Sequence, residues 1–287
     1  MKILLIGKTG QLGASLLNLD SEHQWYAPNR AELDLESIDS CRQAMRQFQP
    51  DIVINTAAFH NLPMCESHPG RAFAVNCKSV RDLALLCKEH DTLFITFSSD
   101  YVFDGATDVP YNEYSPTSPL QMYGITRLAG EHAVMSVAPQ HSIVIRTCGL
   151  YGTIGAASKG GNFVDNRIKD AQHLPHIEMG CDQIVSPTSA LDLAKAVLTL
   201  IQHPKRKMGI YHLVNQGECS WYEFTCKIIE LMKLDVKVVP IDRNGLSGDM
   251  RRPKYSVLAN IKAKKLGINM QHWQDALSEY ITAKYLN

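Results

Sequence analysis

A chain of 287 residues is long enough for one large domain, or for one domain with a smaller second one, and it predicts a sizeable buried core. Acidic and basic residues balance at 29 each, which excludes a basic nucleic-acid-binding protein and an acidic disordered chain. The longest apolar runs have the length of a strand, so no transmembrane helix is expected. The eight cysteines form no C-x-x-C pair, which argues against a zinc ribbon or a disulfide scaffold and favours free thiols in a cytoplasmic protein.

Short apolar runs alternate with segments of helical periodicity through the first half of the chain. Strands are predicted at residues 2–6, 24–28, 51–54, 92–97 and 142–146, and helices at 11–19, 37–47, 68–89 and 123–138. This alternation predicts an α/β fold, a doubly wound parallel sheet with helices on both faces. Its ligand crevice should lie at the carboxyl ends of the strands.

After about residue 147 the alternation loosens, and a second, smaller C-terminal lobe is predicted. Helical patterns cover residues 163–173, 188–203, 220–233 and 271–284, and a strand is predicted at 236–240. We expect residues 148–287 to form mainly this lobe and to bind the substrate. A segment near 188–215 is expected to return to the first domain, which spans residues 1–147.

A glycine-rich loop directly follows the first predicted strand. Gly7, Gly10 and Gly13 have the spacing G-x-x-G-x-x-G and open the first helix. A Cβ at these positions would hold a diphosphate away from the amide groups of the helix N-terminus, where the helix dipole favours an anion. Because the loop lies between a strand and a helix, residues 1–147 are predicted to bind a dinucleotide, with Gln11 and Leu12 among the contacts.

The residues after the second strand bear on the choice of dinucleotide. Arg30 stands about 20 residues after Gly10, where an acidic residue would bind a ribose 2′-hydroxyl. An arginine there can pair with a 2′-phosphate, which favours NADP(H) over NAD(H); a solvated surface arginine is the alternative. Asp34 either accepts a hydrogen bond from the adenine amine or caps the next helix.

Small and polar residues follow the third strand. Ala57 and Ala58 would let a flat cofactor lie across the strand end, with ordinary packing as the alternative. Asn76 lies inside a helical pattern, where its amide would bond either backbone or ligand. The predicted cofactor contacts beyond the glycine loop are Arg30, Asp34, Leu35, Ala57, Ala58, Asn76, Tyr123 and Arg127.

The chemistry is predicted at the end of the fourth strand. Ser99 is delivered to the crevice there, and Tyr123 and Arg127, four residues apart in a helix, share one face. A phenol titrates near pH ~10 and an adjacent cation favours phenolate, so we expect Arg127 to lower the pKa of Tyr123. This predicts a carbonyl reductase with Tyr123 as general acid, Ser99 as hydrogen-bond donor to the substrate oxygen, and Arg127 as electrostatic tuner and ribose ligand.

Further motifs accompany these residues: Ser98–Gly105, Pro110–Glu113, Ser118–Gly124, Asp182–Thr188 and Arg252–Ser256. Together they resemble the dTDP-4-dehydrorhamnose reductase group of extended short-chain dehydrogenases/reductases over nearly the whole chain. The resemblance implies a Rossmann fold and NADPH-dependent reduction at C4 of a nucleotide-linked 4-keto-6-deoxy sugar, in deoxysugar and cell-surface polysaccharide (lipopolysaccharide) biosynthesis. It also implies that the 123–127 helix lies beside the nicotinamide ribose.

Three positions depart from the family pattern. Arg127 stands where the family has Lys, Gly149 where it has Trp, and Ser99 where it has Thr. Arg127 keeps the positive charge of a lysine at this position, although its planar guanidinium does not reproduce the contacts of a lysine ammonium group. Gly149 removes an aromatic wall expected beside the sugar, which leaves room for a differently shaped sugar.

The substrate contacts are expected in both lobes. Lys159 and Arg251 are weaker candidates for the diphosphate, since solvated surface charge is the favoured alternative for both. Asp182 lies where some relatives place magnesium, but one carboxylate beside a glutamine is a poor metal site, so no metal is expected. The predicted substrate-binding residues are Asp100, Tyr101, Gly149, Asn162 and Arg252, with aromatic packing as the alternative for Tyr101.

Two other functions stay open. A dihydrostreptose-type synthase would rearrange and reduce a dTDP-4-keto sugar, and Arg127 and Gly149 leave room for it. A non-catalytic NADP-binding regulatory subunit, similar to the beta subunit of methionine adenosyltransferase, is supported by Arg127 and opposed by Tyr123 and Ser99. For the leading reductase hypothesis we expect NADP(H) as cofactor and a nucleotide sugar as partner, neither nucleic acid nor membrane, and a homodimer as an option.

Overall fold

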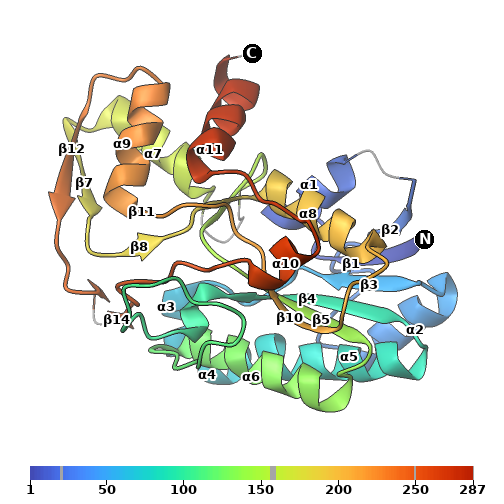
Figure 1. Cartoon of the computed structure of the whole chain (residues 1–287). Helices are drawn as coiled ribbons and strands as arrows, with labels where there is room; N and C mark the ends of the chain where they lie inside the picture. The colour runs from blue at the N-terminus through green and yellow to red at the C-terminus, as the bar shows by residue number, and fades with distance from the viewer. Residues whose placement is uncertain (20–21, 156–159, 249, 287) are drawn as a thin grey trace.

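Six parallel strands form the central sheet of the protein (Figure 1), whose computed structural model describes residues 1–19, 22–155, 160–248 and 250–286. In spatial order they are β2 (Gln24–Tyr26), β1 (Lys2–Ile6), β3 (Ile52–Asn55), β4 (Leu93–Ser99), β5 (Ser142–Thr147) and β10 (Gly209–His212). The chain changes direction across the sheet between β1 and β3. The carboxyl ends of these two strands therefore flank a crevice in which such folds bind their ligands.

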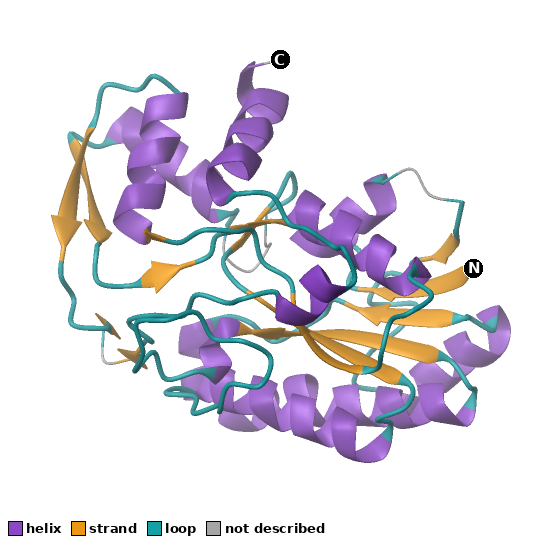
Figure 2. Ribbon diagram, in the orientation of Figure 1, coloured by secondary structure: helices purple, strands orange, loops and turns teal. Residues whose placement is uncertain are grey.

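Helices cover both faces of this sheet (Figure 2). One layer consists of α1 (Gln11–Asn18), α8 (Ala190–Gln202) and α10 (Ile261–Lys265), and the other of α2 (Ile38–Phe48), α5 (Ser79–Glu89) and α6 (Met122–Val137). Within β1, Ile3 and Leu5 are buried against the first layer, whereas Leu4 and Ile6 are buried against the second. A strand that is apolar on both faces requires helices on both sides, and the predicted doubly wound parallel sheet is confirmed.

The segment predicted as one helix over residues 68–89 is broken. It consists of α4 (Pro69–Phe73), one wide turn of π-helix at Ala74–Lys78, and α5, and it follows an unpredicted helix α3 (Leu62–Ser67). His68, with φ −132°, ends α3, and Pro69 begins α4, where its missing N–H costs no hydrogen bond. The wide turn lies where Gly130 of α6 packs against the Asn76 carbonyl oxygen, too closely for a Cβ.

After β5 the chain enters a second lobe, at the upper left of Figure 1. It contains α7 (Phe163–His173), α9 (Trp221–Leu231), α11 (Trp273–Ile281) and a turn at Thr282–Leu286, with β7 (His176–Gly180) and β12 (Lys237–Ile241) paired in parallel. Short strands complete it: β6 (Leu150–Tyr151), β8 (Ile184–Val185), β9 (Thr188–Ser189), β11 (Cys219–Ser220), β13 (Leu246–Ser247) and β14 (Met250–Arg251). Buried Tyr151, Phe224 and Trp273 give this lobe an aromatic core of its own.

The chain returns to the first sheet after residue 189. Helix α8 packs on α1, and β10 pairs with β5. Residues 190–212 therefore extend both the sheet and the helix layer that contains α1. The strand β10 was not predicted. The boundary at residue 147 between two domains stays a prediction.

No helix in the described part of the chain is both long and apolar enough to cross a membrane.

Candidate active site

The loop between β1 and α1 leaves backbone groups open toward the crevice. Gly7 has φ +94°, and a Cβ on it would lie 2.9 Å from the Ala57 backbone nitrogen. A Cβ on Gly13 would overlap the Gly7 carbonyl oxygen. Gly10 is the N-cap of α1, where no side chain accepts from the first amide groups. This loop fits a dinucleotide diphosphate, because only glycines leave the close approach open and the helix N-terminus favours an anion.

Two arginines meet one carboxylate beyond the end of β2. Arg30 has a side chain that is 77% exposed, and its guanidinium is 3.4 Å from Glu36. Arg71 of α4 lies 2.6 Å from the same carboxylate. A pair of guanidinium groups can bind a phosphate through several charged hydrogen bonds. Arg30 as a 2′-phosphate ligand stays a prediction, and the structure adds Arg71, which no spacing in the sequence connects with Arg30.

Asp34 does not cap the helix that follows it. Its carboxylate accepts a hydrogen bond from the Glu36 backbone N–H at 3.1 Å, which closes a turn before the helix. Ser37 caps α2 instead, since its hydroxyl accepts from the Ser40 N–H. The capping alternative for Asp34 is therefore wrong, and its contact with adenine stays a prediction.

The other predicted cofactor residues line the same end of the sheet. Leu35 and Ala57 pack partly buried against the α2–α5–α6 layer. Asn76 is 2% exposed; its amide oxygen accepts from the Phe59 N–H at 2.8 Å and its nitrogen donates to the Phe59 carbonyl at 2.9 Å. These bonds favour the alternative in which Asn76 bonds to backbone. They hold in place the loop that carries Ala57 and Ala58.

Ser99, Tyr123 and Arg127 meet at the carboxyl end of β4. The Ser99 hydroxyl lies near enough to the Tyr123 phenol to lower its pKa, and the Arg127 guanidinium carbon is 5.9 Å from the Tyr123 ring centre. The Tyr101 ring stands edge-on to Tyr123, with 6.0 Å between centroids. Gly124 permits this approach, since a Cβ on it would overlap the Tyr101 carbonyl oxygen. The three predicted catalytic residues are thus brought together.

The expected sign of the Tyr123 pKa shift is wrong. Burial of the phenol raises its pKa, while the Arg127 charge and the Ser99 hydrogen bond oppose that rise. The desolvation of a phenolate outweighs the attraction of the cation. Tyr123 is therefore protonated at neutral pH, which is the state that a proton donor in a reduction requires.

Arg127 is a buried cation with unused hydrogen-bonding capacity. It is 6% exposed, and its Nε has no hydrogen-bond partner among the described residues. A buried donor without a partner is costly. Ribose hydroxyls beside the crevice would satisfy it, so the donor set fits the dinucleotide that the glycine loop also fits.

Asp100 lies behind the hydroxyl of Ser99 and away from solvent, being 4% exposed. Its Oδ1 accepts from Ser99 Oγ at 2.7 Å, and its Oδ2 accepts from Ser256 Oγ at 2.7 Å and Cys148 Sγ at 3.1 Å. Burial raises the pKa of Asp100, and these hydrogen bonds oppose the rise. A direct contact of Asp100 with substrate stays a prediction.

The predicted diphosphate ligands differ in their surroundings. Arg252 lies near enough to Tyr101 for its charge to lower the pKa of that phenol, against a larger rise caused by burial, and its Nε has no partner among the described residues. Asn162 is occupied within the fold: it caps α7 and donates to the Gly152 carbonyl and, at 2.8 Å, to Tyr280 Oη. Lys159 lies outside the described residues.

An aromatic side chain from the second lobe lies against Gly149. This glycine has φ +52°, and a Cβ on it would be 3.1 Å from Cη2 of Trp221 in α9. The indole also packs on Phe163, with ring centroids 4.6 Å apart. An indole from α9 therefore lies against position 149, which the sequence alone did not indicate, and the role of Gly149 beside a sugar stays a prediction.

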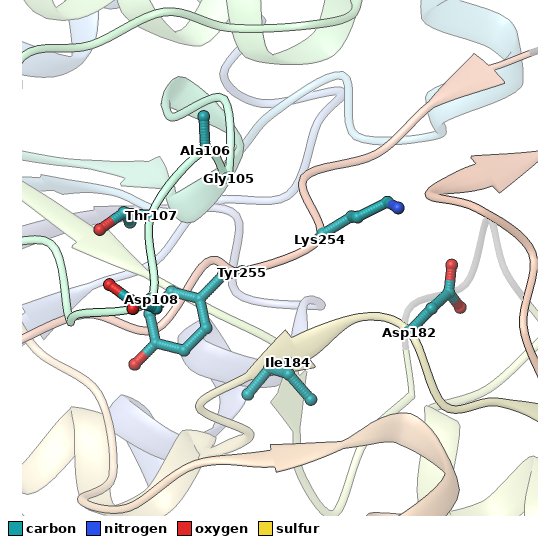
Figure 3. Close-up of a pocket in the computed structure, with 8 residues that line it drawn as sticks. All are labelled: Gly105, Ala106, Thr107, Asp108, Asp182, Ile184, Lys254 and Tyr255. Atoms are coloured by element: carbon teal, nitrogen blue, oxygen red, sulfur yellow. The ribbon is translucent and has the colours of Figure 1, made fainter.

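A surface hollow of about 610 Å³ lies beside the segment that carries Ser256 (Figure 3). Figure 3 shows Asp108 and Tyr255 on one side of it, with Lys254 and Asp182 on the other. Asp182 accepts a hydrogen bond from the Gly245 N–H at 2.6 Å and so anchors a turn. Neither Ser99 nor Tyr123 lines the hollow, so the hollow is distinct from the site formed by Ser99, Tyr123 and Arg127.

Comparisons with known proteins identify relatives along nearly the whole chain. The family model described as RmlD substrate binding domain matches residues 1–286. The spore coat polysaccharide biosynthesis protein SpsK of Bacillus subtilis is 34% identical, with 98% of this chain and 96% of that protein covered. A dTDP-4-dehydrorhamnose reductase of Streptomyces griseus is 33% identical, with 98% and 93% covered.

The fold is shared with a solved structure over its full length. The dTDP-4-dehydrorhamnose reductase of Bacillus anthracis, in complex with NADP, superposes with a TM-score of 0.92 at 29% identity, covering 98% of this chain and 99% of that one.

Proposed function

Because this chain belongs to the dTDP-4-dehydrorhamnose reductase family of extended short-chain dehydrogenases/reductases, we propose that it uses NADPH to reduce the 4-keto group of a dTDP-linked 4-keto-6-deoxy sugar. The observation that carries this proposal is the cluster of Ser99, Tyr123 and Arg127 beside a crevice whose glycine loop fits a dinucleotide. The nucleotide sugar is its substrate. No disulfide joins any of the eight cysteines in the described part of the chain, which supports a reducing, cytoplasmic location.

The first domain holds and orients the cofactor. NADPH supplies a hydride to C4 of the sugar when bound. Gly7 and Gly13 keep the backbone open to the diphosphate, Arg30 and Arg71 bind the 2′-phosphate, and the free Nε of Arg127 donates to a ribose hydroxyl. These contacts fix the distance between the reacting carbons, which is the main contribution a protein makes to such a transfer.

Tyr123 supplies the proton. Burial keeps its phenol protonated, and the phenol donates to the C4 oxygen as negative charge develops there. Arg127 stabilises the phenolate that remains, because a cation fixed in a buried site acts through a low effective dielectric. The reaction leaves a neutral alcohol at C4 and a deprotonated Tyr123.

The second lobe contributes substrate contacts. Arg252, beside Tyr101, offers an unpartnered Nε to the substrate diphosphate. Trp221, packed at Gly149, offers the aromatic surface against which the sugar is held. A ring supplied by α9 changes the shape of the sugar pocket relative to a side chain at position 149, and so bears on which 4-keto sugar fits.

The test is NADPH oxidation by the purified protein with dTDP-4-dehydrorhamnose, with its 4-keto-6-deoxyglucose precursor in a parallel reaction, and identification of products by NMR. An intact pyranose reduced at C4 is expected. A branched furanose would replace this proposal with the rearranging synthase. Absence of oxidation with both sugars, while NADPH still binds, would contradict the proposal and favour a regulatory subunit.

A further inference from the structure

The proton donor Tyr123 lies in the first turn of its helix, the part that the helix itself holds least firmly. The first four N–H groups of a helix have no acceptor within it, and helix ends fray. Tyr123 is the second residue of α6, so the position of its backbone depends on groups outside the helix. A proton donor must stay within about 0.5 Å of its productive position. The contacts of this turn therefore bear on the reaction.

Two side chains hold the amide groups on either side of Tyr123. Gln121 is the N-cap of α6, and its amide oxygen accepts from the Gly124 N–H at 2.9 Å. Glu66, which belongs to α3, accepts from the Met122 N–H at 2.7 Å. The first-turn residues Met122, Tyr123 and Gly124 are not acidic. Glu66 thus supplies, from another element, the negative charge that stabilises a helix N-terminus.

The carbonyl group of Tyr123 is held as well. The hydroxyl of Thr126 donates to it at 2.9 Å and accepts from the side-chain nitrogen of Asn76 at 3.1 Å. Thr126 and Asn76 are both buried. Asn76 and Glu66 belong to the same segment, between β3 and β4, so this one segment fixes the backbone on both sides of Tyr123. Glu66 is exposed, and its bond can be altered without opening the core.

The helix that carries Glu66 is itself held in place. Asn61 caps α3, because its side-chain oxygen accepts from the Met64 N–H at 3.0 Å. Cys65, next to Glu66, is fully buried, and its thiol donates to the Phe59 carbonyl oxygen at 3.4 Å. Helix α3 also packs directly against α6 (Figure 1). The Glu66 carboxylate therefore starts from a fixed point, which a group that positions another element requires.

We propose that Glu66 is a positioning residue for the reduction: it holds the first turn of α6 and thereby places the Tyr123 phenol against the C4 oxygen of the sugar. This inference rests on the proposed reductase function. Glu66 acts through the Met122 N–H and exchanges no proton with the substrate. Without this bond the first turn gains freedom, and Tyr123 loses its fixed distance from Arg127, one turn further along. The chemical step should suffer more than the binding of NADPH or sugar.

The experiment compares kcat and KM of Glu66→Ala and Glu66→Gln with NADPH and dTDP-4-dehydrorhamnose. Glu66→Ala removes the acceptor, and kcat should fall by about tenfold or more, since a shift of ~1 Å in a reacting group can cost about a hundredfold. Both KM values should change by less than about threefold. Glu66→Gln keeps an acceptor oxygen and should restore kcat to within about threefold of the wild type. Wild-type kcat in Glu66→Ala, or equal losses in both variants, would overturn the proposal.

Asp51→Ala is the matched control for a loss of stability alone. Asp51 is also exposed, and its carboxylate accepts from the Lys2 backbone N–H at 2.7 Å, the same distance as in the Glu66 bond. It lies at the amino end of the sheet, opposite the crevice, so Asp51→Ala should leave kcat unchanged. Thermal unfolding of both alanine variants compares their stability. A fall in kcat as large in Asp51→Ala as in Glu66→Ala would overturn a positioning role.

A second readout does not depend on turnover. NMR of the free protein with carbon-13 in its tyrosine rings follows Tyr123, whose signal is assigned by its absence in Tyr123→Phe. This signal should move or broaden in Glu66→Ala and stay in place in Glu66→Gln and Asp51→Ala. An unchanged signal in Glu66→Ala overturns the positioning role. Failure of the wild type to oxidise NADPH, by contrast, contradicts the proposed reductase, whatever the NMR spectra show.

Discussion

Arg127 combines a buried charge with a donor that no described residue uses. Replacing it with methionine removes the cation that stabilises the Tyr123 phenolate, and we expect kcat to fall by about a hundredfold or more. Arg127→Lys keeps the charge and should retain kcat within about tenfold of the wild type, with a change in the affinity for NADPH because the ammonium has a different geometry. Steady-state kinetics check this. A methionine variant as active as the wild type would remove Arg127 from the mechanism.

Arg30 and Arg71 should act together on the choice of cofactor. Arg30→Ala is expected to weaken NADPH binding by roughly tenfold or more, because a charged hydrogen bond to phosphate is lost. NADH, which lacks the 2′-phosphate, should be little affected, and Arg71→Ala should follow the same pattern. Binding titrations with both cofactors decide the matter.

A matched control is Arg42→Ala, an arginine of α2 that is paired with Asp39 at 2.6 Å. Its replacement should leave both cofactors bound as before. Equal losses for NADPH and NADH in Arg30→Ala would contradict a phosphate contact.

For individual residues, spacing in the sequence predicts which side chains meet, but it does not predict the direction of their pKa shifts. Tyr123 and Arg127 lie one helical turn apart, so their proximity follows from helical geometry alone. The sign of the Tyr123 pKa shift depends on burial by Tyr101 and the adjoining turn, which is set by tertiary packing. Of the three donors on Asp100, Cys148 and Ser256 come from segments far from it in sequence, and no local pattern indicates them.

The contact between α9 and the loop after β5 consists of Trp221 packed against Gly149, and substitutions at these two residues test it. Gly149→Ala places a Cβ 3.1 Å from Trp221 at a positive φ, so we expect a loss of about 1–2 kcal/mol in the free energy of unfolding. Trp221→Phe shortens the ring and should recover part of that loss in the double variant. Denaturant unfolding of the two single variants and the double variant measures the coupling.

The outcome for Gly149 separates crowding from backbone strain. Equal losses from Gly149→Ala in the wild-type and Trp221→Phe backgrounds would show that the indole does not limit position 149. Activity with the two 4-keto sugars, measured in the same variants, reports whether the indole also shapes the sugar pocket.

Elements with a strong repeating pattern were predicted and irregular ones were not. The helix at 163–173 matches α7, and the first five strands match within a few residues. The strand β10 escaped prediction because Gly209–His212 is short and carries a polar end, and it becomes a strand by pairing with β5. The wide turn at Ala74–Lys78 was missed because it depends on the close approach of α6 at Gly130.

For the whole molecule, pH should change stability through His212. Burial lowers the pKa of His212 to about 3, and the positive charge of Arg146 adds to this effect. The pKa of His212 in the folded protein lies below its value of ~6.5 in the unfolded chain. The contribution of His212 to the free energy of unfolding is therefore complete above pH ~6.5 and is lost as pH falls. Between the unfolded and folded pKa values the loss approaches about 1.4 kcal/mol per pH unit.

His212→Gln cannot take up a proton and serves as the reference. Thermal or urea unfolding at several pH values from 7 to 4 should show the wild type more stable near neutrality, with the difference narrowing as pH falls. A difference that stays constant over this range would mean that His212 titrates alike in the folded and unfolded chains.

Trp221 gives the molecule an optical signal at the boundary of its two lobes. The indole packs against three apolar clusters, one beside the sheet and two within the second lobe, and it remains partly exposed. The other two tryptophans lie elsewhere, Trp25 on the edge strand β2 and Trp273 in the core of the second lobe. Emission from Trp221, isolated by subtracting the spectrum of Trp221→Phe, would therefore follow the relative motion of the lobes without any attached dye.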